Sequence, residues 1–187
     1  MTDPIRAEIR QRLQPVLRVR QIREFTDDAP TEAELDAIVD AARWSGSSHN
    51  EQPWRFIVIR DRATLLALLA AGKPSTRSLA TASAAVAIVV PGAEDRQLWH
   101  AFDEGRAAER MLIAASILGL AGGVSFTWVR PEVRAAMRDI LGVPSEWNVR
   151  TMVALGHPTE GALRPKSGPG LARLPRHEVV FDERWGG

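Results

Sequence analysis

The connection between a predicted helix and a predicted strand reads WSGSSHNEQPWRF over residues 44–56. Its small hydroxyl residues, Ser47 and Ser48, offer Oγ atoms and backbone N–H groups to a phosphate or a ribityl chain. Asn50 and Gln52 each carry a hydrogen-bond donor and an acceptor, which the amide-and-imide edge of a heterocycle would require. A plain polar loop can have the same composition, so the stretch alone leaves both interpretations open.

The residues on either side of this loop have clear secondary-structure patterns. Upstream, Thr31 and Glu34 form the pattern of a capping box, and apolar residues then recur at helical spacing, which predicts a helix over about residues 32–43. Downstream, residues 54–60 are rich in β-branched and aromatic side chains and predict a strand. The loop therefore joins a capped helix to a strand.

A second polar stretch, RVRQIREF at residues 18–25, lies between this helix and an amphipathic N-terminal helix that is expected to end near Pro15. Arg18, Arg20 and Arg23 lie in a non-helical segment, where such spacing lets the side chains converge on one anion. Their forked guanidinium donors match the geometry of a phosphate. A solvated basic turn has the same spacing, so an anion site is one of two interpretations here.

The rest of the chain alternates between helical and strand patterns. Strands are predicted at residues 85–90, 124–129 and 152–155, and helices at about 62–71, 96–119 and 131–141. In the longest helix, an apolar stripe that includes Phe102, Met111 and Leu118 predicts a central, largely buried element, whereas Arg106 and Arg110 are expected on a solvated or ion-paired face. The irregular order of elements indicates an α+β fold with one mixed sheet.

The last thirty residues differ in kind from the rest. They are rich in glycine and proline and predict an irregular C-terminal arm over about residues 157–187. The arm ends in Val179, Val180 and Phe181, which are apolar enough to need a docking surface, of the kind a partner subunit provides. No interdomain linker is visible, so residues 1–187 are expected to form a single domain.

Composition excludes several classes of protein. The chain has 187 residues, of which 45% are hydrophobic and 25% charged, as in ordinary soluble, folded proteins. It has no cysteine, which excludes thiolate nucleophiles, zinc-thiolate sites and iron–sulfur clusters. The net charge of +1 argues against a nucleic-acid binder. The four histidines are too scattered to form a metal site, so no metal is expected.

Location can also be predicted from the sequence. No apolar run approaches the roughly 18 residues of a membrane span, and no signal-peptide pattern is visible. We therefore expect no membrane association and a cytoplasmic location.

The ordered set of motifs resembles the nitroreductase family of flavin enzymes. The resemblance begins with Arg-x-x-Arg-x-Phe-Thr at residues 20–26 and continues with Ser-Ser-x-Asn-x-Gln-Pro-Trp-Arg-Phe at residues 47–56. It extends through DEGRAAERMLIAA at residues 103–115, GLAGG at 119–123, LGHP at 155–158 and RLPRHEVV at 173–180. It therefore covers about residues 15–181, nearly the whole chain.

The resemblance implies a homodimer of α+β subunits, with a long central helix and a C-terminal arm exchanged between them. An FMN would bind in each of two clefts at the interface. Arg23 would lie near the flavin N1/C2=O edge, Gly122 and Gly123 would let the backbone approach the ring, and Arg173 would hold the phosphate from the arm. The small-residue loop would contribute from the other subunit or at the seam. The implied cofactor-binding residues are Arg18, Arg20, Gln21, Arg23, Ser47, Ser48, Asn50, Gln52, Gly122, Gly123 and Arg173.

The resemblance also implies a reaction. NAD(P)H would give hydride to flavin N5, and the reduced flavin would pass it to an electron-poor acceptor such as a nitroaromatic or a quinone. No general acid or base is assigned, and Arg23 would stabilise negative charge at N1/C2=O. The alternatives are an enzyme of the same fold that uses deazaflavin or consumes flavin, and a non-catalytic protein that stores FMN.

Overall fold

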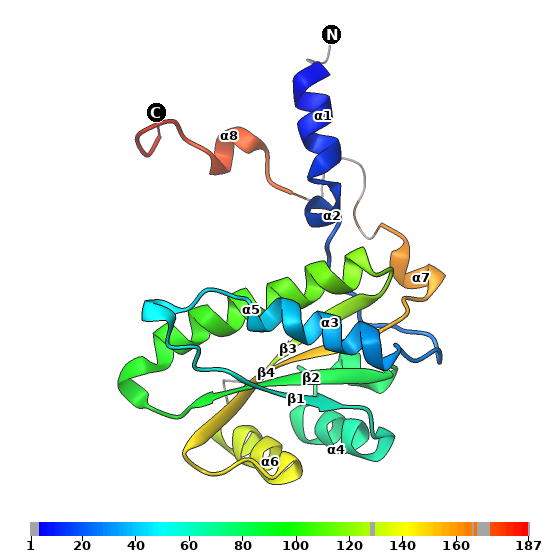
Figure 1. The fold of residues 1–187 in the computed structure, drawn as a ribbon, viewed down its shortest axis with the longest axis vertical. Coiled ribbons are helices and arrows are strands. Elements are labelled where there is room, and N and C mark those ends of the chain that lie inside the picture. The colour runs from blue at the N-terminus through cyan, green and yellow to red at the C-terminus, as the bar shows by residue number, and fades with distance from the viewer. Residues whose placement is uncertain (1–3, 128–129, 166, 168–172, 187) are drawn as a thin grey trace.

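The computed structural model describes residues 4–127, 130–165, 167 and 173–186. Its centre is one antiparallel sheet whose strands lie in the order β1-β2-β4-β3 (Figure 1). The strands are β1 Arg55–Ile59, β2 Ala84–Pro91, β3 Ala121–Phe126 and β4 Trp147–Gly156. The α+β class is confirmed, and all four strands were predicted. Residues 128–129, which the sequence assigned to the third strand, lie outside the described residues.

The expected mixed sheet is not what the described strands form. A helical crossover, α5 Gln97–Ile117, joins β2 to β3, and these two strands do run in the same direction. They are not neighbours, however, because β4 lies between them and pairs antiparallel with each. Every hydrogen-bonded pair of described strands is therefore antiparallel.

Two pairs of helices cover the two faces of the sheet. α3 Glu32–Arg43 and α5 pack on one face, and α4 Arg62–Gly72 and α6 Pro131–Leu141 pack on the other (Figure 1). Strand β2 is buried on both sides, since alternate residues belong to opposite cores: Val86 and Ile88 face α3 and α5, and Ala85 and Ala87 face α4 and α6. Short helical segments complete the chain at α1 Pro4–Arg12, α2 Gln14–Leu17, η1 Ser48–Asn50, η2 Arg77–Ala80, η3 Glu94–Arg96, α7 Glu160–Leu163 and α8 Arg176–Val179.

Helix α5 is central, but its predicted apolar stripe is partly wrong. Met111 is fully buried as expected, whereas Phe102 is 66% exposed and Leu118 is 40% exposed. Phe102 precedes Met111 by nine residues, which at about 100° per residue is half a turn out of phase. Leu118 has the correct phase but caps the helix at its end.

A buried charge cluster fixes α5 to β4. Arg150 donates from Nε to both carboxylate oxygens of Glu104, at 2.8 and 3.0 Å, and Thr151 Oγ1 donates to Glu104 Oε2 at 2.7 Å. Both charged side chains are at most 2% exposed. Burial raises the pKa of Glu104, and this effect outweighs the opposing effect of the hydrogen bonds from Arg150 and Thr151.

The two ends of the chain project from this body. Helices α1 and α2 and the segment that carries α8 extend away from the sheet and its covering helices (Figure 1). No side chain of α1 or α2 is buried, and the apolar residues Ile5, Ile9, Val179 and Trp185 are all more than half exposed. Across the described part of the chain, no helix is both long and apolar enough to cross a membrane.

Candidate functional site

The basic segment at residues 18–25 lies against the N-terminal half of β3. Ile22 N donates to Gly122 O at 2.8 Å, and a Cβ added to Gly123 would collide with the carbonyl oxygen of Ile22. At the end of the segment, Phe25 forms an isolated bridge with Pro158. Gly123, which was expected to let the backbone approach a flavin ring, thus makes room for the segment itself, whereas a Cβ on Gly122 would collide with Leu112.

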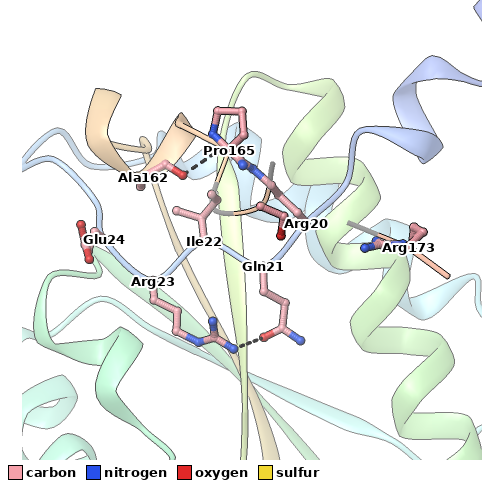
Figure 2. A pocket seen from close by; sticks show the side chains of 9 residues that line it. Arg20, Gln21, Ile22, Arg23, Glu24, Ala162, Pro165 and Arg173 are labelled. Carbon is pink, nitrogen blue, oxygen red and sulfur yellow. Dashed lines mark hydrogen bonds between the residues drawn. The ribbon is translucent and has the colours of Figure 1, made fainter. Parts of the chain in front are cut away.

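The segment and the C-terminal arm together line a cavity of about 230 Å³ (Figure 2). Its charged and amide side chains come from Arg20, Gln21, Arg23, Glu24 and Arg173. The structure therefore brings together residues that are about 150 positions apart in the sequence and that were all predicted, except for Glu24, to bind the same cofactor. With three guanidinium groups and one carboxylate, the lining has a net positive charge.

The arginines of this cavity have distinct contacts. Arg20 donates from NH1 to the carbonyl oxygen of Arg164 at 3.3 Å and from NH2 to that of Ala162 at 3.0 Å, so it holds the segment against α7 (Figure 2). Arg23 donates from NH2 to Gln21 Oε1 at 3.2 Å. Arg20 thus has a structural contact as well as a place in the cavity wall.

A second cavity of about 280 Å³ adjoins the first, since Arg20 and Ile22 line both. Arg18 and Gly122 line this second cavity. Arg18 also donates from Nε to Gln14 Oε1 at 2.8 Å. Each cavity alone is smaller than the roughly 300–1,000 Å³ of most ligand pockets.

The polar loop at residues 44–52 has an unusual backbone. His49, Asn50 and Gln52 have φ values of 49°, 57° and 50°, in the left-handed region that non-glycine residues rarely occupy. Ser47 Oγ accepts a hydrogen bond from Gln52 N at 2.9 Å, and Gln52 Nε2 donates to Asn50 Oδ1 at 3.2 Å. The loop is therefore more specific in shape than a plain polar connection.

The loop and the basic segment lie at different places along α5 (Figure 1). The loop contacts Arg96, Arg106 and Arg110, whereas the cavity next to the segment is lined by Leu112 and Ser116. At about 1.5 Å per residue, Arg106 and Ser116 are about 15 Å apart along the helix. Within one chain, the structure thus separates Ser47, Ser48, Asn50 and Gln52 from the other predicted site residues.

Sequence reasoning missed the contribution of α5 to this loop. Arg106 and Arg110 were expected on a solvated or ion-paired face, but Arg110 donates from NH1 to the carbonyl oxygen of Trp44. Arg106 does lie near Asp103, at 3.8 Å, but it also packs against Gly46. No local pattern predicts these contacts, because the partners are about 60 residues apart.

Comparison with known proteins identifies the family. A profile of the nitroreductase family matches residues 17–78, which include both the basic segment and the polar loop. A protein of Archaeoglobus fulgidus, described as an inferred NADH dehydrogenase/NAD(P)H nitroreductase, is 32% identical over 143 residues, which cover 75% of this chain and 82% of the relative. This chain belongs to the nitroreductase family. A second relative of this nitroreductase-family chain, an NADH dehydrogenase of Thermus thermophilus, is 29% identical, with 88% of the chain and 92% of the relative covered.

Solved structures confirm the nitroreductase fold. An FMN-dependent nitroreductase of Clostridium difficile R20291 superimposes with a TM-score of 0.79 at 24% identity, over 91% of this chain and 99% of the other. An NADPH:FMN oxidoreductase of Vibrio harveyi, solved in complex with NAD+, gives a TM-score of 0.76 at 22% identity, over 94% of this chain and 78% of the other. The resemblance inferred from the ordered motifs is therefore correct in family and in fold.

Proposed function

We propose that this chain is an FMN-dependent NAD(P)H oxidoreductase that works as a homodimer. One observation carries the proposal: Arg20, Arg23 and Arg173 reach a single cavity from segments far apart in the sequence. Guanidinium groups from separate segments are the usual means of holding a phosphate group. The names of the Clostridium difficile and Vibrio harveyi proteins, which specify FMN, and the bound NAD+ of the latter support the choice of cofactors.

The residues present fit FMN. Arg20 and Arg173 would hold the phosphate in the first cavity, since its lining is net positive and Arg20 uses only two of its five N–H donors on carbonyl oxygens. The adjoining cavity, which Arg18 and Gly122 line, has room for part of the rest of the FMN molecule. Gln21 and Arg23 line the first cavity and supply side-chain hydrogen-bond donors for the edge of a heterocycle.

We further propose that each site is completed by the polar loop of a second copy. None of Ser47, Ser48, Asn50 and Gln52 lines either cavity of its own chain, and each cavity is small for a complete cofactor site. The exposed apolar residues of α1 and of the arm are the surface that such a partner would cover. A twofold dimer would then contain two equivalent sites.

The chemistry asked of the side chains is modest. Bound FMN would take a hydride from NAD(P)H at N5 and pass it to an electron-poor acceptor such as a nitroaromatic or a quinone. Arg23, half-buried and oriented by Gln21, would stabilise the negative charge that reduction places on the N1/C2=O edge. No residue is assigned as a general acid or base. The proposal includes a cytoplasmic location, where a cysteine-free enzyme and its NAD(P)H donor would meet.

The visible spectrum of the purified protein tests the cofactor. We expect a yellow protein, or one that gains flavin absorption on incubation with FMN, and we expect NADH or NADPH to bleach that absorption under anaerobic conditions. A protein that takes up no FMN contradicts the proposal. A protein whose bound FMN neither nucleotide reduces would instead be a flavin-storage protein, and deazaflavin in the released ligand would replace FMN as the cofactor.

A further inference from the structure

The polar loop at residues 44–52 is held in a costly conformation. His49, Asn50 and Gln52 have positive φ values, and none of them is glycine. Such backbone persists only where surrounding contacts determine it. Within the loop, Ser47 Oγ accepts from Gln52 N, Gln52 Nε2 donates to Asn50 Oδ1, and the backbone N–H groups of Asn50 and Glu51 donate to the carbonyl oxygens of Ser47 and Ser48. These side chains are at or near the surface, so additional contacts are needed to fix the loop.

Three arginines, two on α5 and one at its N-cap, supply contacts from outside the loop. Arg96 NH2 forms an ion pair with Glu51 Oε2 at 2.5 Å, next to the left-handed residues. Arg110 NH1 donates to the carbonyl oxygen of Trp44, where the loop begins. The hydrogen bond from Arg96 lowers the pKa of Glu51, which keeps this carboxylate charged at neutral pH.

The third arginine packs against the loop at a glycine. The guanidinium group of Arg106 occupies the space that a Cβ on Gly46 would fill. Arg106 is itself held on α5, since its guanidinium carbon lies 5.6 Å from the centre of the Phe102 ring and NH1 lies 3.8 Å from Asp103 Oδ1. Arg110 lies four positions after Arg106, so both project from the same side of the helix.

Helix α5, which carries Arg106 and Arg110 and begins directly after Arg96, is a rigid base. It spans 21 residues, and the buried Glu104–Arg150 pair fixes it to β4. Contacts from such a base restrict the loop more than contacts from another surface loop would.

We propose that Arg96, Arg106 and Arg110 are positioning residues that hold the 44–52 loop in its left-handed form, ready to bind the flavin. The identity of the ligand rests on the proposed function, whereas the restraint of the loop does not. The restraint reduces the conformational entropy that the loop would lose on binding. Three charged side chains, two on α5 and one at its N-cap, would thus set cofactor affinity without contacting the cofactor.

Hydrogen exchange in the ligand-free, full-length protein tests the restraint. The amide N–H groups of Asn50, Glu51 and Gln52 are hydrogen-bonded within the loop. In R110A and R96A, we expect these amides to exchange about tenfold faster, the effect of losing one charge-assisted hydrogen bond. R60A is the matched control, because Arg60 makes only an exposed pair with Glu32 at 3.9 Å. Exchange that stays at the wild-type rate in both R96A and R110A overturns the proposal.

A double-mutant cycle tests the packing of Arg106 against Gly46. In G46A, the new methyl group must displace the guanidinium, so we expect the loop amides to exchange faster than in wild type. In R106A, the same glycine substitution should add no further increase, because the clash is gone. An equal effect of G46A in both backgrounds contradicts the assigned role of Arg106. All of the substituted residues are partly or fully exposed. Thermal unfolding of each variant checks that it is folded.

Flavin titration connects the restraint to binding. We expect R110A to raise the Kd for FMN about tenfold, and R110K to recover part of the loss because lysine can still donate to Trp44 O. An unchanged Kd together with faster loop exchange overturns the link between the loop and the cofactor. If the wild-type protein binds no FMN, the proposed function fails, and the exchange experiment still decides the restraint.

Discussion

Arginines in this chain have different roles that sequence spacing does not distinguish. Arg20 and Arg23 both line the cavity, but Arg20 also holds α7, whereas Arg23 is paired with Gln21. Arg173 reaches the same cavity from the C-terminal arm. A substitution at Arg20 would therefore disturb the fold as well as the cavity, which makes Arg173 the cleaner position for testing ligand contacts.

We predict that R173A weakens FMN binding about tenfold or more, the effect of losing a hydrogen bond to a charged group. Fluorescence titration of the flavin measures the Kd. The control is R176A, at the start of α8, which removes a charge from the arm without altering the cavity. An equal loss of affinity in both variants would indicate a general effect of the arm's charge, and no loss in R173A would remove Arg173 from the phosphate site.

Two glycines are expected to respond in opposite ways to alanine. G123A places a methyl group against the backbone oxygen of Ile22, which cannot move without shifting the basic segment, so we predict a loss of about 1–3 kcal/mol in the free energy of unfolding. G105A, in α5, meets no atom within 4 Å and should gain about 0.5–1 kcal/mol through helix propensity. Denaturant unfolding measures both. Similar stabilities of the two variants would contradict the close approach of residues 20–24 to β3.

At the scale of elements, the sequence predicts what local contacts determine. The helix over 32–43 was predicted at its observed boundaries because Thr31 and Glu34 form its capping box directly. The exposure of Phe102 could also have been predicted, since a regular helix turns it away from Met111. The position of β4 between β2 and β3 could not be predicted from the sequence, because strand order depends on pairing between distant segments.

The same limit applies to the candidate site. The motifs around Arg20 and Ser47 were recognisable because each is contiguous in sequence. The separation of these motifs along α5 and the contact of Arg110 with Trp44 depend on how a helix packs against a loop about 60 residues away. Gly123 was predicted to bind the cofactor, and its close contact with Ile22, about 100 residues earlier, could not be predicted from the sequence.

The α5–β4 contact provides a prediction at this scale. In E104Q, Arg150 keeps a hydrogen-bonding partner but loses its buried counter-charge, so we predict a loss of about 3–5 kcal/mol in stability. The comparison is D40N, which removes a carboxylate from an exposed pair with Arg43 and should change stability by less than about 1 kcal/mol. Equilibrium unfolding in urea distinguishes them, and a near-neutral E104Q would show that the cluster is not needed to fix α5.

At the scale of the whole molecule, the body and its projections differ in what stabilises them. The body has two apolar cores, one on each face of the sheet. Helices α1 and α2 have no buried side chain, although Ile5, Ile9 and Leu17 are apolar. Within one chain, these helices therefore gain little from apolar burial, and their stabilisation has to come from another surface.

We predict that removal of residues 1–17 leaves the unfolding of the body almost unchanged but weakens the proposed dimer. Circular dichroism would report the fold, and light scattering across a range of concentrations would report the molecular mass. A truncated protein that remains a dimer at the same concentrations would exclude α1 and α2 from the interface. A truncated protein that fails to fold would show that these helices contribute to the body itself.

The separation of the two motifs along α5 has a genetic consequence. On the proposed arrangement, a dimer of chains altered only at Arg173, or only at Asn50, has two defective sites, whereas both defects fall in the same site when the two kinds of chain pair with one another. A mixed pair would have one doubly damaged site and one fully wild-type site. Random mixing of the two chains would therefore restore about a quarter of all sites. Two loss-of-function alleles of this single gene would complement each other.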